Sequence, residues 1–218
     1  MAIEGTTAAV NMDRIYRHQR RIYDASRAYY LLGRDQLLRE LNPPPDAVIL
    51  EIACGTARNL LRAADLYPGA RLYGVDISSE MLTTARASIA KSRHSGRIKI
   101  ALADATSFET HRLLGIASAD RIFISYAVSM IPRWMTALDE AVRRLAPGGS
   151  LHIVDFGTMQ GMPAPARRAL VSWLARFDVT PRRSLETTCQ LLAARHGLKC
   201  TFHQSPRGYF ARAVISAN

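Results

Sequence analysis

The chain contains 218 residues, enough for one domain with a single hydrophobic core. Hydrophobic residues make up 48% and charged residues 22%, a globular composition that excludes a disordered or fibrous protein. The net charge is +11, and residues 156–218, with nine basic and two acidic side chains, supply +7 of it. A basic flank beside a nearly balanced core predicts attraction to an anionic partner, such as nucleic acid, a membrane surface or an acidic substrate.

The sequence contains no segment that predicts a membrane span or a disulfide framework. The longest uncharged apolar stretch, residues 122–132, has 11 residues, whereas a transmembrane helix needs about 20. The N-terminus lacks the charged start and apolar run of a secretion signal. Cys54, Cys189 and Cys200 are odd in number and have no CxxC spacing, which indicates a reducing compartment and no zinc site. We therefore expect a cytoplasmic protein without a bound metal.

Strands and helices alternate along most of the chain. Residues 9–41 are predicted to be helical, with a break or bend at Gly33, and the prolines at residues 43–45 end this helix. Strands are predicted at residues 47–52, 71–75, 97–102, 121–126 and 151–155, with helices at residues 58–66, 79–91, 110–115 and 133–145 and a turn at residues 147–149. Such alternation predicts a parallel, doubly wound, Rossmann-like sheet, because parallel neighbours need crossover helices.

Beyond residue 156 the alternation stops. Helices are predicted at residues 165–177 and 184–196, followed by strands at residues 198–203 and 209–216. The connection between these strands is too short for a crossover helix, so the last of the seven strands should be antiparallel. We expect one α/β domain over residues 1–218, with a helical N-terminal lid (1–45), a core (46–155), and a basic region of extra helices and a C-terminal hairpin (156–218).

The first candidate site is the turn after the first strand, in the segment VILEIACGTAR at residues 48–58. A buried strand carrying Glu51 leads through small residues into a helix. In open α/β sheets ligands bind at the carboxyl ends of strands, where a helix N-terminus presents free N–H groups. Gly55 would let the main chain approach such a ligand, because no Cβ stands in the way.

Two further acidic residues end the following strands. Asp76 lies 21 residues after Gly55, the spacing at which a carboxylate meets a ribose in dinucleotide-type folds. Asp104 ends the third strand, and LAPGGSL at residues 145–151 leads into the fifth. The alternative is that Asp76 and Asp104 only cap helices. A single glycine in the first turn argues against a nicotinamide fingerprint, and the motifs of phosphate loops, zinc proteases and serine hydrolases are absent.

Together, LEIACGTARNL, YGVDIS, ALADAT and LAPGGSLHIVDF resemble, in this order, the class I S-adenosylmethionine-dependent methyltransferases. The resemblance implies S-adenosylmethionine as cofactor and S-adenosylhomocysteine as product. The implied cofactor contacts are Glu51, Ala53 and Gly55 on the methionine side, Asp76 on the ribose, Ile77, Met81, Asp104 and Ala105 around the adenine, and Ser125 with Tyr126 at the transfer site. Ala53 and Ala57 replace two glycines of the family pattern. Alanine fits a tight turn less readily than glycine does, so the turn could be less tight than in the family.

Tyrosine and arginine alternate at helical spacing in the N-terminal helix, at Tyr16, Arg20, Tyr23, Arg27, Tyr30 and Arg34. One interpretation is packing of tyrosine on the core with arginine at its margin. The other is a lid in which Tyr23 and Arg27 contact the cofactor, aromatic faces hold a cation and guanidinium groups hold a carboxylate.

The segment RIYRHQRRIYDASRAYYLLGRDQLL, with SYAVSMIPRW, VDFG and RGYFARAV, resembles the bacterial betaine-lipid methyltransferases, which N-methylate diacylglyceryl-homoserine three times. An amine that becomes a fixed cation favours aromatic walls. The candidate transfer-site residues are Tyr16, Tyr23, Tyr126 and Tyr209, and no general base is evident.

A lipid acceptor needs access to a membrane, and residues 163–183 combine apolar side chains with five arginines, as in an interfacial helix on an anionic surface. The alternative for this segment is an amphipathic helix packed on its own core. The competing functions are a soluble methyltransferase of a quinone precursor or amine, and a nucleic-acid-binding protein of the same fold. Nucleic acid is disfavoured because no appended binding module is present.

Overall fold

The structure is a computed structural model, and it describes residues 31–217. Its centre is one seven-stranded sheet with the order β3-β2-β1-β4-β5-β7-β6. The strands are β1 (Val48–Ile52), β2 (Arg71–Asp76), β3 (Ile98–Leu102), β4 (Ala119–Ser125), β5 (Leu145–Phe156), β6 (Lys199–Gln204) and β7 (Phe210–Ser216). Strands β1 to β5 pair in parallel, and β7 is antiparallel to both β5 and β6. The predicted doubly wound sheet with an antiparallel last strand is confirmed.

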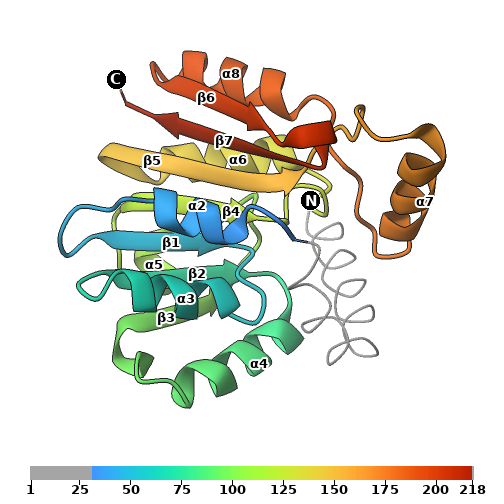
Figure 1. The fold of residues 1–218 in the computed structure, drawn as a ribbon. Helices are drawn as coiled ribbons and strands as arrows, with labels where there is room; N and C mark the ends of the chain where they lie inside the picture. Colours follow the sequence, from blue (N-terminus) through green and yellow to red (C-terminus); the bar gives the residue numbers. More distant parts are fainter. Residues whose placement is uncertain (1–30, 218) are drawn as a thin grey trace.

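Helices cover both faces of the sheet (Figure 1). They are α2 (Arg34–Glu40), α3 (Arg58–Leu66), α4 (Ser79–Ala90), α5 (Thr110–Leu114), α6 (Trp134–Arg143), α7 (Ala164–Ala175) and α8 (Leu185–Arg195), with short 3-10 turns at Ser95–Arg97 and Pro206–Gly208. Helices α2, α3 and α4 bury leucine and alanine side chains on one face, and α5, α6 and α8 do so on the other. Strand β1 is buried along its whole length because both faces are covered.

Side-chain alternation divides the buried residues into two cores. Ile49 and Phe123 face the core under α2, α3 and α4, whereas Leu50 and Ile122 face the core under α5, α6 and α8. The central strands β1 and β4 therefore contribute to both cores, which is why they are mostly apolar.

The helix boundaries agree closely with the sequence pattern. Helix α3 has the predicted bounds, and Ser78 caps α4 by accepting a 3.2 Å hydrogen bond from the N–H of Met81. The expected break at Gly33 is also confirmed, since Gly33 has φ 82° and precedes α2. The part of the predicted N-terminal helix at residues 9–30 lies outside the described residues.

The predicted turn at residues 147–149 is wrong in one respect. These residues lie inside β5, which begins at Leu145 and runs for 12 residues. The pairing partner changes from Ala119–Leu145 to Arg121–Ser150, so the extra residues form an irregularity within the β4–β5 ladder. Gly148 supplies the positive φ of 74° that this bend requires.

Helix α7 stands apart from the two layers. It extends beyond the carboxyl ends of the parallel strands (Figure 1), and Leu174 is its single fully buried side chain. None of the helices within residues 31–217 is long and apolar enough to cross a bilayer.

His152 makes the stability of the fold depend on pH. It is buried in β5, where a ring nitrogen lies 2.8 Å from Oγ of Ser150. Burial, with a smaller effect of the Arg121 charge, lowers the pKa of His152 from 6.5 to about 4. Between these values the unfolded chain binds a proton that the folded protein excludes, so His152 lowers stability as the pH falls from 6.5 toward 4.

We expect His152→Gln to remove this dependence while it keeps a hydrogen bond to Ser150. Between about pH 7 and pH 4.5 the wild type should lose about 2.5 kcal/mol more unfolding free energy than the variant. Urea unfolding of both proteins at the two pH values measures these losses. All other titrating groups are present in both proteins, so their effects cancel when the two losses are subtracted. Parallel pH profiles for the two proteins would contradict the prediction.

Candidate functional site

The site is built where the chain order of the strands reverses. From β1 the chain proceeds outward to β2 and β3, and then returns to place β4 on the other side of β1. In doubly wound sheets the loops on either side of such a reversal leave the sheet in opposite directions and border a crevice at the carboxyl ends of the strands. Glu51 in β1, Asp76 in β2 and Ser125 in β4 lie beside this switch point.

The turn after β1 is tight although alanine replaces glycine at two positions. Ala53, Gly55 and Ala57 all have left-handed φ values, of 58°, 53° and 63°. The N–H of Cys54 donates to the carbonyl of Val75, and the N–H of Ala57 to that of Cys54. A left-handed alanine costs about 1 kcal/mol, so the turn stores strain that the surrounding contacts hold. The two alanines therefore do not open the turn.

Gly55 is hydrogen-bonded to the end of β2 on one side and borders open space on the other. Its N–H donates a 2.7 Å hydrogen bond to Oδ2 of Asp76, whose Oδ1 accepts the N–H of Ser78 at 2.9 Å. A Cβ at Gly55 would meet no atom within 4 Å, so the turn borders open space. The opening is suited to a ligand that contacts the main chain directly.

One of the two carboxylate oxygens of Glu51 is buried without a hydrogen-bond partner. The residue is 1% exposed, and its Oε1 accepts a 2.7 Å hydrogen bond from Nδ2 of Asn59 on α3. Oε2 is buried and has no hydrogen-bond partner. Burial raises the pKa of Glu51 well above its usual value, the Asn59 bond opposes this, and the Asp76 charge adds to it. A cationic donor next to Oε2 would satisfy this oxygen, and the ammonium group of an amino acid is such a donor.

A second buried oxygen lies on the other side of the switch point. Oγ of Ser125 has no hydrogen-bond partner, and Ser125 ends β4, the strand paired with β1. Buried polar atoms without partners are uncommon in folded proteins, and a ligand that hydrogen-bonds to them is one explanation. Glu51, Gly55 and Ser125 thus lie at or just beyond the carboxyl ends of the paired strands β1 and β4, and their contact with a cofactor stays a prediction.

The residues expected around the adenine are spread along the edge of the same crevice. Ile77, Asp104 and Ala105 are half-buried, whereas Met81 is buried and packs against Met130 and Phe177. Oδ1 of Asp104 accepts the N–H and the hydroxyl of Thr106, each at 2.8 Å. Asp76 and Asp104 each accept a main-chain N–H from two residues further on. Their carboxylates therefore stabilise local turns, as the capping alternative predicted.

The tyrosine predictions fall partly outside the described residues. Tyr16, Tyr23 and Arg27 lie there, and their roles stay predictions. Tyr126 is buried, and its hydroxyl donates a 2.5 Å hydrogen bond to the carbonyl of Leu32. Burial raises the pKa of Tyr126 above that of an ordinary phenol.

Tyr126 begins a short row of aromatic rings. The ring centroid of Phe156 lies 4.8 Å from that of Tyr126 and 6.1 Å from that of Tyr209, with edge-to-face geometry in both pairs. Tyr209 is half-buried. The row joins the end of β4 to the ends of β5 and β7, so two of the predicted transfer-site tyrosines lie in one aromatic group.

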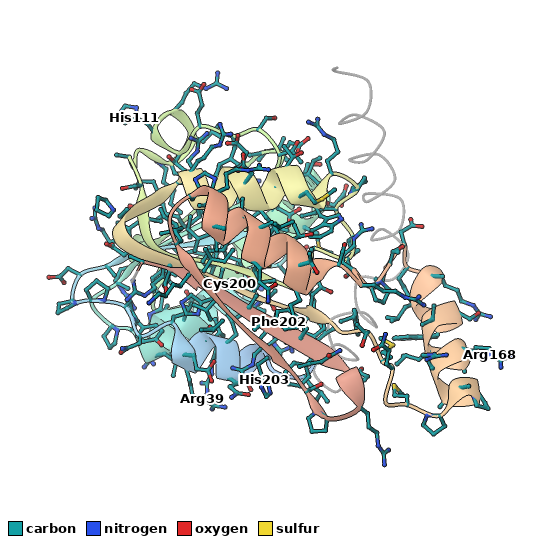
Figure 2. All side chains as sticks on the ribbon, turned by 90° about the horizontal axis from the view of Figure 1, so that it is seen from above. Arg39, His111, Arg168, Cys200, Phe202 and His203 are labelled. Carbon is teal, nitrogen blue, oxygen red and sulfur yellow. The ribbon has the colours of Figure 1, made fainter. Side chains whose placement is uncertain are left out.

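The basic surface predicted over residues 163–183 is smaller than expected. Arg182 is half-buried, and its guanidinium donates to the carbonyls of Val128 and Ile131. It therefore binds the protein's own main chain. Arg168, Arg176 and Arg183 are exposed, and Figure 2 shows Arg168 pointing away from the domain at the outer side of α7.

Sequence reasoning missed four residues beside the crevice. Asn59 was detectable, since it lies in the first turn of the helix that follows the Glu51 strand, where its side chain can reach back to Glu51. Met130, Trp173 and Phe177 had no local signal, because their contacts join segments far apart in the chain. The described residues contain no group of three or more histidine, cysteine, aspartate or glutamate side chains placed to bind a metal.

The sheet order and the crevice define a Rossmann-like methyltransferase fold. A family model described as a methyltransferase domain matches residues 49–149. The ubiquinone/menaquinone biosynthesis C-methyltransferase UbiE of Paracoccus denitrificans is 31% identical over 144 residues, which are 65% of this chain and 53% of that protein. The demethylmenaquinone methyltransferase of a Geobacillus species is 26% identical over 141 residues, 64% of this chain and 58% of that protein. The chain thus spans somewhat more than half the length of these relatives.

Among solved structures, phosphoethanolamine N-methyltransferase 2 of Haemonchus contortus in complex with S-adenosyl-L-methionine has a TM-score of 0.68 at 16% identity. The match covers 85% of this chain and 52% of that one. This likeness concerns the fold. The family model over residues 49–149 and the methyltransferase relatives support an S-adenosylmethionine-dependent methyltransferase domain in this part of the chain.

Gly55→Ala tests the open space at the turn, and Gly148→Ala is its matched control. Both glycines have positive φ and no atom within 4 Å of an added Cβ, but Gly148 lies at the opposite end of β5 from the crevice. Each variant should lose about 1 kcal/mol of stability from backbone strain. Gly55→Ala alone should weaken S-adenosylhomocysteine binding, by about tenfold or more, in calorimetry. Equal affinities of the two variants would contradict the assignment.

Glu51 should release protons when the cofactor binds. The pKa of Glu51 is raised in the free protein, and an ammonium next to Oε2 would lower it again, so cofactor binding would displace protons from Glu51. Cofactor affinity should therefore rise with pH through the raised pKa of Glu51. Calorimetry in two buffers of different ionisation enthalpy measures proton release in the wild type and in Glu51→Gln. The same release from both proteins would rule out Glu51 as its source.

Proposed function

We propose that the chain transfers a methyl group from S-adenosylmethionine to a small acceptor that has an apolar part. The observation that supports the cofactor site most directly is the buried, unpartnered Oε2 of Glu51 next to the open space at Gly55. Glu51 would hold the ammonium group, the main chain at Gly55 would approach the methionine portion, and Asp76 would hold the ribose. When bound, the cofactor supplies an electrophilic methyl group on a sulfonium.

The chain's own contribution is orientation. Methyl transfer is an in-line displacement: the acceptor atom forms a bond to the methyl carbon as its bond to the sulfonium sulfur breaks, and S-adenosylhomocysteine leaves. A carbon acceptor or a primary or secondary amine then loses one proton, whereas a tertiary amine loses none. Holding the two reactants in line supplies much of the rate. The rigid turn at residues 53–57 and the loop after β4 are the elements that would hold them, and neither requires a metal ligand.

The surroundings of the acceptor side favour an apolar molecule. Half-buried Met130, Met162, Trp173 and Phe177 pack against the core on the side of the crevice where α7 lies. Such side chains suit a flat ring or a hydrocarbon tail. The named activities of the relatives, C-methylation in ubiquinone and menaquinone biosynthesis, support a reduced quinone precursor as the first candidate.

A second candidate is the amine of diacylglyceryl-homoserine, methylated at a membrane surface. Two observations favour it: the aromatic row of Tyr126, Phe156 and Tyr209, which suits a developing ammonium, and the exposed arginines of the α7 region, which suit an anionic bilayer. Exposed Val171 adds apolar surface to the same helix.

Turnover with radiolabelled S-adenosylmethionine separates the candidates. The acceptors to compare are a reduced naphthoquinone with an isoprenoid tail, diacylglyceryl-homoserine in mixed micelles, and the tail-free head group of each. We expect the tailed quinone to be methylated once, at carbon, with kcat/KM about tenfold or more above that of its head group. Sequential mono-, di- and trimethylated lipid, with binding to anionic vesicles at physiological salt, would instead establish the second candidate. No turnover with any acceptor would contradict both.

A further inference from the structure

The loop after β4, residues 126–131, is bonded to segments from both ends of the described chain. At its start, the Tyr126 hydroxyl donates to the carbonyl of Leu32, just before α2. In its middle, the carbonyl of Ser129 accepts the N–H of Thr180 at 2.9 Å. The N–H of Ser129 in turn donates to Oδ2 of buried Asp155 at the end of β5. The loop is therefore held from three directions at the acceptor side of the crevice.

Arg182 adds two further bonds to this loop. Its Nε donates to the carbonyl of Val128 at 3.1 Å, and a terminal nitrogen donates to the carbonyl of Ile131 at 2.8 Å. The guanidinium also lies over the ring of Trp134, 5.9 Å from its centroid, and is attracted by the Asp155 carboxylate. One planar group thus fixes both sides of the loop, a geometry that a lysine ammonium cannot reproduce.

The two connected segments meet at the start of α4. Met130, from the loop, and Phe177, from the end of α7, both pack against buried Met81 at the start of α4. The Trp173 and Phe177 rings are in edge-to-face contact, with centroids 5.1 Å apart. Sulfur–aromatic and aromatic–aromatic contacts of this kind hold an apolar surface in one arrangement. The position of this surface depends on the loop to which residues 180 and 182 are bonded.

We propose that Arg182 is a positioning residue for the acceptor: it holds the Met130 loop against the segment after α7, so that Met130 and Phe177 form a fixed apolar wall on the side of the crevice where α7 lies. This proposal rests on the proposed function. It assigns to Arg182 an effect on acceptor binding and alignment, exerted through the loop, and no contact with the cofactor.

Arg182→Met and Arg182→Lys test the proposal, with Arg183→Met as a control that removes the same charge from an exposed neighbour. Hydrogen exchange of the unliganded protein needs no acceptor. The amides of residues 128–131 and 178–180 should exchange about tenfold or more faster in Arg182→Met, to a smaller extent in Arg182→Lys, and at the wild-type rate in Arg183→Met.

With the acceptor that proves active, Arg182→Met should raise the acceptor KM and lower kcat/KM by about tenfold or more, and Arg182→Lys should restore part of the loss. Affinity for S-adenosylhomocysteine should equal that of the wild type. Unchanged exchange in Arg182→Met overturns the proposal whichever acceptor is used. Faster exchange with unaltered acceptor kinetics overturns it as well. Failure of every acceptor in the wild type contradicts the proposed function instead, and that result is separate from the exchange measurement.

Discussion

The hydrogen bond from the Gly55 N–H to Asp76 connects the two strand ends on which the cofactor side of the site depends. It joins the turn after β1 to the end of β2 at 2.7 Å, and the same carboxylate accepts the N–H of Ser78 at the start of α4. One buried side chain therefore sets the relative position of three elements. The left-handed residues at 53, 55 and 57 are maintained against their conformational cost because this carboxylate and the β1–β2 ladder hold both ends of the turn.

The acceptor side is organised differently, by contacts between segments far apart in the sequence. Asp155, Thr180 and Arg182 bind the main chain of the loop after β4, and Tyr126 binds that of Leu32. On the proposed cofactor side, Glu51, Gly55 and Asp76 lie within about 25 positions of one another, whereas the proposed acceptor side gathers residues from distant parts of the described chain. A change of acceptor could therefore be achieved through α7 and its connections, with the turn at Gly55 left intact.

Helix α7 relates the two candidate functions to each other. Its inward side contributes Leu174 and Trp173 to the apolar surroundings of the crevice, while Arg168 and Val171 face outward. A methyltransferase acting on a tailed quinone and one acting on a diacyl lipid both need an apolar path from the crevice to the surroundings of the protein. The position of this helix is compatible with either acceptor, and the chemistry of the accepting atom distinguishes them.

The sequence by itself determined the strand–helix order, the antiparallel last strand, the Ser78 cap and the placement of Glu51, Gly55 and Asp76 at strand ends. These features depend on hydrophobic periodicity, turn residues and short spacings, which act within one or two elements. Tertiary structure alone decided that Arg182 turns inward, that Tyr126 bonds to Leu32, that residues 147–149 lie inside β5, and that Met130 meets Phe177. Each of these depends on which distant segments pack together, and a side chain's own neighbours in the sequence carry no signal of that contact.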